Sequence, residues 1–293
     1  MTLRSTLRCL AGLGGVGLVA VATAQTPADP KEPIKPATYS PPGSFIPPAD
    51  SPPTSPVPAI LKVEPGTLPV NGAEAFPKMI ADARAAYGKV RDYSCVLIRQ
   101  EVVGGKLRPE QMAELRVRTQ PLGMNLSVTA PKANSGEEIS YLPSRFAAKL
   151  RYKAPGIEGL KYGYVTVASD DSRLVANTRH PITETGLLAV LDRSEKALAT
   201  EKRLNHPVQI LVANYTFSGR AVTRYEVFSE KTHPARYAYR WVILVDKETK
   251  LPVRFEAYDQ PKPGSTAGGE LLEVQSFVGI KTNTGFGESV FER

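Results

Sequence analysis

The sequence predicts an α+β protein in which a highly curved antiparallel sheet wraps two amphipathic helices. Several segments between residues 93 and 280 alternate apolar and polar side chains, which is typical of antiparallel strands with one face in water. Short turns rich in Gly, Asp, Ser and Thr separate the strand-like segments. Two longer segments instead repeat apolar residues every three or four positions, as amphipathic helices do.

The N-terminal segment is expected to lie outside this domain. Residues 1–24 carry Arg4 and Arg8, then an apolar run and a small-residue box, an order typical of a cleavable export signal. A single-pass anchor is the alternative, but the apolar run is shorter than the roughly 20 residues that cross a bilayer. No later stretch is apolar enough to span a membrane.

Residues 25–72 are predicted to be a disordered, proline-rich linker. Of the chain's 26 prolines, 14 lie between Thr26 and Pro69. Such a segment buries too little apolar surface to offset its ordering entropy and tends to extended conformations. We therefore expect a single α+β domain at residues 73–293.

Charge and cysteine content limit the partners and the cross-links. Removal of the signal lowers the net charge from +8 to +6 and leaves Cys95 as the one thiol. A lone cysteine cannot form an internal disulfide, so the core must hold without one. The basic excess favours anionic partners such as lipid headgroups. Because Lys and Arg are scattered singly along an exported chain, we expect no nucleic-acid binding.

In chain order, the first helix is predicted at residues 73–90, and a β-rich half follows it. The strand at 93–103 stops at Gly104-Gly105, a pair suited to a tight hairpin turn. The alternation is clearest in two segments, where the apolar set is Leu115 and Val117, then Met124, Leu126 and Val128. Shorter strands are predicted at 137–141, 146–152 and 161–168.

The second helix is predicted at residues 185–204, where leucines recur between charged residues. A second group of strands joined by short turns follows, which predicts a meander. Its most hydrophobic face is the alternating row from Tyr237 through Trp241 to Val245, and we expect this row to meet the helices. The predicted strands are 208–217, 221–229, 237–246, 251–258 and 271–280.

Known catalytic and metal-binding motifs are missing from the sequence. The one G-x-G-x-x-G lies within the export signal, and no Walker loop, H-E-x-x-H, G-x-S-x-G or S-x-x-K occurs. His180, His206 and His233 are far apart and each precedes a proline, unlike the close ligand pairs of zinc sites. We therefore expect no catalytic residue, no metal and no cofactor. Cys95 is read as a small buried side chain.

The segment Asn177–Gly186, NTRHPITETG, is the candidate site. As a structural element it leads into the second helix, with Thr183 or Thr185 as the helix cap and Arg179 pairing with Glu184 or with backbone. As a functional element, Arg179, His180 and Glu184 line the mouth of a pocket between sheet and helix, where an anionic group is favoured. Trp241, in the hydrophobic row, is the fourth residue expected to contact a ligand.

Several of these features together resemble a known family. The export signal, the first helix, the Tyr93-Ser94-Cys95 strand and above all the RHPITETG stretch are similar to an uncharacterised family of secreted bacterial domains, over about Ala73 to Phe291. That family in turn resembles the periplasmic lipoprotein carriers and sensors of the LolA and RseB type. The resemblance implies a LolA-like half-open barrel around an apolar cavity, and a lipid or acyl-chain site. It carries over no catalytic residue.

The leading hypothesis is a non-enzymatic, exported protein of the bacterial envelope, periplasmic or extracellular. It would hold a hydrophobic or anionic lipid-like ligand between the sheet and the helices. The alternative is a structural or interaction module with a filled core, presented by the linker to an envelope protein. A third hypothesis is a hydrolase that uses His180 and Glu184, in which replacing either residue would abolish an activity and leave the melting temperature nearly unchanged.

Overall fold

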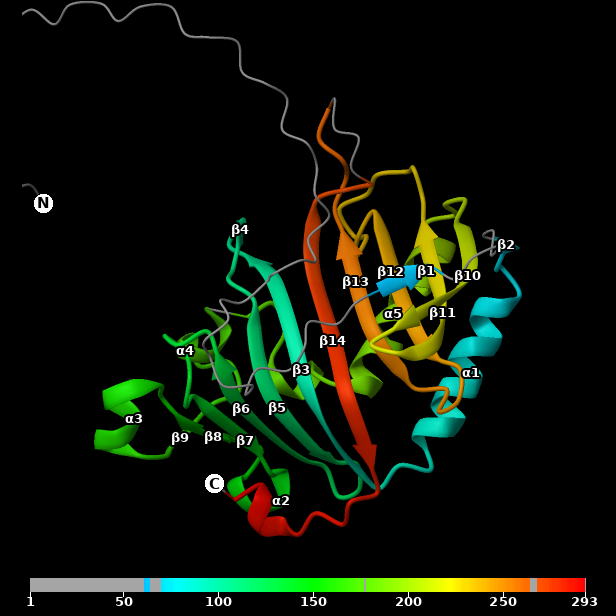
Figure 1. Cartoon of the computed structure of the whole chain (residues 1–293). Helices are drawn as coiled ribbons and strands as arrows, with labels where there is room; N and C mark the ends of the chain where they lie inside the picture. The colour runs from blue at the N-terminus through cyan, green and yellow to red at the C-terminus, as the bar shows by residue number, and fades with distance from the viewer. Residues whose placement is uncertain (1–60, 64–69, 177, 264–267, 293) are drawn as a thin grey trace, which may run out of the picture. The chain divides into compact units, whose positions relative to one another are not determined.

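Two antiparallel meanders, joined where β14 pairs with β3, make up the sheet (Figure 1). One meander runs through the N-terminal half, and its strands are β3 (Asp92–Val103), β4 (Lys106–Leu107), β5 (Gln111–Arg118), β6 (Gly123–Ala130), β7 (Glu138–Tyr141), β8 (Leu150–Lys153) and β9 (Val165–Val167). The other runs through the C-terminal half, with β10 (Gln209–Phe217), β11 (Arg220–Phe228), β12 (Arg240–Asp246), β13 (Pro252–Tyr258) and β14 (Leu271–Thr282).

The computed structural model describes residues 61–63, 70–176, 178–263 and 268–292. The predicted export signal and most of the predicted linker lie outside these residues, as does Asn177. Within them, every strand pairing is antiparallel, and the order begins with the short strand β1 (Leu61–Val63) and continues β10-β11-β12-β13-β14-β3-β5-β6-β7-β8-β9. The sheet curves around the longer helices, so the predicted fold class is confirmed (Figure 1). In the described part of the chain, no helix is long and apolar enough to span a bilayer.

Both predicted amphipathic helices are present, each shorter than predicted at its ends. Helix α1 (Ala75–Tyr87) packs on α5 (Leu187–Arg203), and α5 contacts β13. A 3-10 turn, η1 (Ile182–Glu184), precedes α5 and contacts β6 and β7. The segment predicted to be the site therefore crosses the concave face of the sheet and leads into the helix that fills it.

The short helices were not predicted. Helix α3 (Gly156–Tyr162) takes up the start of the strand predicted at 161–168, which contributes only β9. The strand predicted at 146–152 likewise begins later, because α2 ends at Phe146. The remaining short elements are α2 (Pro143–Phe146), α4 (Ser172–Val175) and η2 (Glu288–Val290).

The predicted linker boundary at residue 72 is too late. Strand β1 (Leu61–Val63) and strand β2 (Val70–Asn71) both pair with β10. Each is a short segment without proline, so its backbone N–H groups can join an edge strand. The sheet therefore takes in part of the segment that the sequence assigns to the linker.

The concave face carries the main core. Trp241, Ile243 and Val245 are at most 5% exposed and belong to the same buried cluster as α1 and α5 residues, so this row meets the helices as predicted. Val242 and Leu244 point to the opposite face and are buried as well, in a second cluster with Phe217, Val222 and Val253. The prediction of a wet second face therefore does not hold for β12.

Cys95 lies in the main core with a free thiol. Its burial raises the pKa of the thiol, so the reactive thiolate is suppressed in the folded protein. We expect Cys95 to react with a thiol reagent only after unfolding. Peptide mapping of protein labelled with and without denaturant tests this, and native labelling of Cys95 would contradict the buried position.

Candidate functional site

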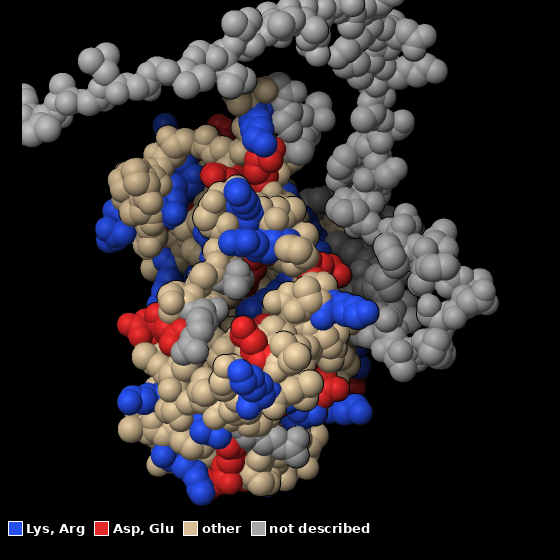
Figure 2. All heavy atoms as spheres, turned by 90° about the vertical axis from the view of Figure 1, so that its left-hand side faces the viewer, with Lys and Arg blue, Asp and Glu red and all other residues tan. Residues whose placement is uncertain are grey.

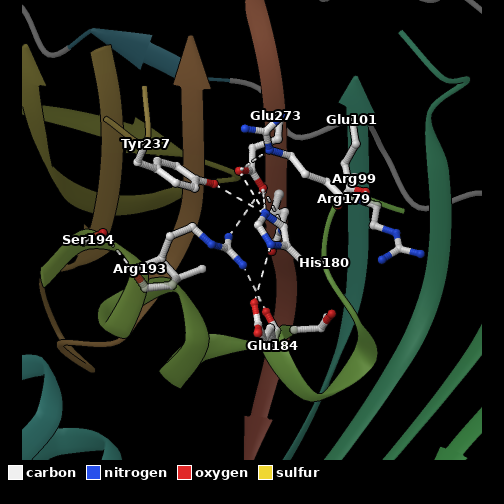
Figure 3. A network of polar contacts seen from close by, with 12 residues as sticks. Arg99, Glu101, Arg179, His180, Glu184, Arg193, Ser194, Tyr237 and Glu273 are labelled. Atoms are coloured by element: carbon white, nitrogen blue, oxygen red, sulfur yellow. Dashed lines mark hydrogen bonds and ion pairs between the residues drawn. The ribbon is translucent and has the colours of Figure 1, made fainter. Parts of the chain in front are cut away.

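A buried carboxylate anchors the candidate site to the sheet. Glu273 on β14 is fully buried, and its Oε2 lies 3.0 Å from His180 Nε2 and 3.4 Å from Arg193 Nη1. Gln275 donates to the same oxygen at 3.2 Å, and Arg179 Nε lies 3.6 Å from Oε1. Figure 3 shows these side chains converging from β14, from α5 and from the segment that precedes α5. The two arginines and the histidine compensate a charge that would otherwise be costly to bury.

A second carboxylate holds the start of the segment. Glu101 on β3 accepts a hydrogen bond from the backbone N–H of Arg179 at 2.8 Å, and its Oε2 lies 3.0 Å from Thr178 Oγ1. Glu101 is 4% exposed. Two acids on neighbouring strands, β3 and β14, therefore bind the segment from Thr178 to His180 and fix its path over the concave face.

Arg193 connects this cluster to the 3-10 turn. Its guanidinium contacts Glu273 and donates through Nη2 to the backbone carbonyl of Glu184 at 3.0 Å. Burial lowers the pKa of Arg193, and Glu273 opposes that shift. The ordinary pKa of a guanidinium is so high that Arg193 keeps its charge at neutral pH. Arg193 thus ties η1, α5 and β14 together.

The start of α5 is capped differently from the prediction. Neither Thr183 nor Thr185 caps the helix: no side-chain cap is present at Gly186, and Thr185 Oγ1 donates to the carbonyl of Pro181 at 3.3 Å. Instead, the hydroxyl of Tyr93 on β3 accepts from the backbone N–H of Leu187 at 3.1 Å. A residue 94 positions earlier in the chain therefore takes the place expected of a neighbouring threonine.

The predicted pairing of Arg179 with Glu184 is replaced by the pairing of Arg179 with Glu273. Glu184 remains 64% exposed in its side chain, with Oε2 at 3.7 Å from His180 Nδ1. Tyr237 stacks on His180 with ring centroids 6.5 Å apart. Because an ionised carboxylate only accepts, the Nε2 atom of His180 that faces Glu273 carries a proton.

A cleft of about 580 Å³ opens beside this cluster, along the outer side of η1 and α5. Arg179, His180 and Glu184 all line it, so the structure brings three of the four predicted site residues together. Trp241 does not line this cleft: it is 1% exposed and belongs to the core, because its strand runs under the helices.

The two ends of the cleft differ in chemistry. One end is lined by three neighbouring residues of the sheet. Tyr93 on β3 pairs with Val117 on β5, and Val117 pairs with Met124 on β6. Tyr87, Leu122 and Leu188 complete this apolar end, and the two leucines are 37% and 36% exposed. The other end is polar, and its lining residues are Arg179, His180, Glu184, Lys196, Arg236 and Tyr237.

The geometry offers little support for hydrolysis. Among the described residues, the hydroxyl near the His180 ring is that of Tyr237, 3.4 Å from Nε2, an atom that already faces Glu273. His206 and His233 lie together, with rings 6.2 Å apart, and His206 bonds Glu201 rather than joining His180. Over the described part of the chain, no three His, Cys, Asp or Glu side chains are grouped as metal ligands.

Sequence reasoning missed Glu273, Arg193 and Glu101 as site residues. Glu273 and Gln275 alternate with Val274, and that pattern alone reads as a solvated face. The available signal was Phe277, which shares their face and is 1% exposed. A strand that carries Glu, Gln and Phe at every second position needs a buried partner for the acid.

The sequence profile of a family described as "Protein of unknown function (DUF1571)" matches residues 90–293. The chain belongs to this family. The expectation of an uncharacterised family is confirmed, and the match includes the whole candidate site. A comparison of the sequence with curated proteins finds no significant match.

Several solved structures are distantly similar to this DUF1571 chain. An uncharacterised conserved protein from Thermus thermophilus has 9% identity and a TM-score of 0.43, over 75% of this chain and 93% of that one. A putative outer membrane lipoprotein-sorting protein domain from Vibrio parahaemolyticus has 11% identity and a TM-score of 0.35, over 74% and 97%. A LolA superfamily protein from Nitrosomonas europaea has 12% identity and a TM-score of 0.28, over 76% and 98%.

Proposed function

We propose that this DUF1571 protein is a non-catalytic, exported protein of the bacterial envelope that binds an amphipathic, lipid-like anion in the cleft beside His180. The observation that supports this is that one cleft is lined both by exposed apolar side chains and by cationic side chains. Its volume of about 580 Å³ is within the range of small-molecule sites, about 300–1,000 Å³.

The apolar end of the cleft exposes hydrophobic side chains to solvent. Leu122 and Leu188 belong to the small set of large hydrophobic residues that are exposed in the described part of the chain, and both face the same cleft. Tyr87 and Tyr93 pack edge to face beside them. An acyl chain laid against this end would remove the two leucines from water, which is the main favourable term for such a ligand.

The polar end supplies cationic groups for an acidic headgroup. Arg179 is 27% exposed in its side chain, and Lys196 is exposed without an ion pair to any described residue. Asp192, one of the acids that line the cleft, pairs with Arg84 at 2.6 Å, so its charge repels an anion less. The carboxylate of Glu184 lies 3.7 Å from His180 Nδ1 but stays 64% exposed, and it favours a headgroup that also donates a hydrogen bond.

A binding assay with matched ligands tests the proposal. A fluorescent fatty acid is titrated against the whole chain, with the corresponding fatty alcohol as the uncharged ligand. Leu122→Ser/Leu188→Ser should weaken both ligands by about tenfold or more, because two apolar contacts are lost. Arg179→Gln should weaken the acid by about fivefold and leave the alcohol unchanged.

Leu107→Ser, at an exposed apolar position away from the cleft, is the matched control and should bind as the unchanged protein does. Native mass spectrometry of freshly purified protein should also show a co-purified lipid. If the protein takes up neither ligand and carries no lipid, the proposal is wrong.

The second candidate is an interaction module without a small ligand. The filled core favours it: Trp241, Phe255 and Phe277 are each at most 1% exposed, so the interior of the sheet holds its own side chains instead of a cavity. The cleft is then part of a surface for an envelope protein. Specific loss of a partner, rather than of lipid, in the Leu122→Ser/Leu188→Ser variant would favour this candidate.

A further inference from the structure

Helix α3 presents hydrophobic side chains to solvent at the edge of the sheet. Ile157 and Leu160 are 82% and 83% exposed, and Tyr162 is 64% exposed, the three highest values among the exposed large hydrophobic residues of the described chain. The helix connects β8 to β9, the last strand of the sheet order, and stands at one end of the molecule (Figure 1). None of the three lines the cleft proposed above.

The orientation of α3 is held by its glycine. Gly159 is buried, and a Cβ atom there would lie 1.9 Å from the carbonyl oxygen of Ala154. Only glycine lets the helix approach the preceding backbone this closely. Ile157 and Lys161, two positions before and after Gly159, lie about 200° around the helix from it. The helix thus buries its smallest residue and turns its aliphatic residues away from the protein.

The segment that contains α3 carries more bases than acids. From Pro143 to Val167 the chain has five Lys and Arg residues and one acid, Glu158. Ion pairs with acids outside this segment occupy two of the five, Lys153 with Glu138 and Arg145 with Glu292. Of the three bases without a described ion pair, Lys149 and Lys161 are exposed, whereas Arg151 is half-buried with its guanidinium over the rings of Phe146 and Tyr164. Figure 2, which looks at the side of the molecule that carries α3, shows charged groups scattered over an otherwise uncharged face.

We propose that α3 is a membrane-docking element that inserts Ile157, Leu160 and Tyr162 into the interfacial region of an anionic bilayer, with Lys149 and Lys161 facing the lipid headgroups. Exposed aliphatic residues flanked by bases are the pattern of interfacial anchors, and tyrosine is favoured at headgroup depth. A seven-residue projection is too small for the roughly 1,000 Å² that a stable protein interface buries. The inference is independent of the cleft and its ligand.

Flotation with vesicles tests the proposal. The whole chain, recovered after export, is mixed with phosphatidylcholine vesicles that contain or lack phosphatidylglycerol. We expect flotation with the anionic vesicles, weakened by salt. Ile157→Ser/Leu160→Ser should lower the partition coefficient by about tenfold or more. Lys161→Gln should lower it by about fivefold on anionic vesicles only.

Leu107→Ser is the matched control, because Leu107 is 53% exposed in the hairpin of β3 and β4, far along the sheet from β9. It should float as the unchanged protein does. The substituted α3 side chains have few contacts, so all variants should keep the melting temperature. Equal flotation of the unchanged protein and the double variant, or no flotation of either, would overturn the proposal. A concentration-dependent dimer that the double variant loses would overturn it in favour of a second copy.

Discussion

Glu273→Ala should lower the free energy of unfolding by about 3–5 kcal/mol, the range found when one partner of a buried ion pair is removed. The carboxylate is fully buried and contacts His180 and Arg193 directly. Without it, the guanidinium of Arg193 remains 7% exposed in a site with no compensating acid at that distance. Urea unfolding followed by the fluorescence of Trp241 measures the change.

The matched control is Glu184→Ala. Glu184 is an acid of the same cluster, but its side chain is 64% exposed, and it contributes its backbone carbonyl to Arg193 rather than its carboxylate. Its loss should change the free energy of unfolding by less than about 0.5 kcal/mol. If Glu273→Ala costs no more than Glu184→Ala, Glu273 is not the structural anchor inferred from the geometry.

A double variant separates the ion pair from its burial. Glu273→Leu/Arg193→Met removes both charges together and should be less destabilised than the two single variants predict by addition. The destabilisation that remains in the double variant measures the loss of the hydrogen bonds to His180 and to the carbonyl of Glu184. Strict additivity would mean that Glu273 and Arg193 do not stabilise each other.

Local patterns in the sequence were sufficient for most elements of the fold. The alternation around Leu115 and Leu126 predicts strands that are present with those residues inside, at 0% and 1% exposure. Gly104-Gly105 predicts a turn, and both glycines have positive φ there. Such patterns work because a strand or a turn depends on neighbouring residues.

Pairing between distant segments could not be predicted in the same way. Strand β14 closes the two meanders by pairing with β3, so that Glu273 lies opposite Glu101. No residue pattern within β3 or β14 specifies which residues of the two strands pair. The candidate site depends on this pairing, because Glu101 and Glu273 bind Arg179 and His180. The sequence therefore pointed to the segment of the candidate site, but not to the side chains that hold this segment in place.

Helix α3 was missed for a different reason. A pattern with Ile157, Leu160 and Tyr162 predicts a buried element, whereas the structure exposes all three. Local propensity does not state which face of a short helix meets the protein, and here the close approach of Gly159 to Ala154 decides it. Because these hydrophobic side chains are exposed in the structure, we assign α3 a contact outside the chain.

Gly186→Ala should lower the free energy of unfolding by about 3 kcal/mol, because it adds backbone strain and a steric conflict at the start of α5. Gly186 has φ +104° and ψ −175°, a conformation open to glycine alone among common residues. A Cβ atom there would lie 2.4 Å from the hydroxyl of Tyr93, the group that accepts from the N–H of Leu187. Thermal and urea unfolding measure the loss.

Gly219→Ala is the control for backbone strain alone. Gly219 has φ +78° in the turn between β10 and β11, with nothing within 4 Å of an added Cβ atom, so the cost should be about 1 kcal/mol. Tyr93→Phe in the Gly186→Ala background removes the hydroxyl that the methyl group would meet. If the steric conflict with Tyr93 contributes, this double variant is more stable than addition of the single effects predicts. Strict additivity would assign the whole effect to the backbone at Gly186, and the hydroxyl of Tyr93 would then only cap α5.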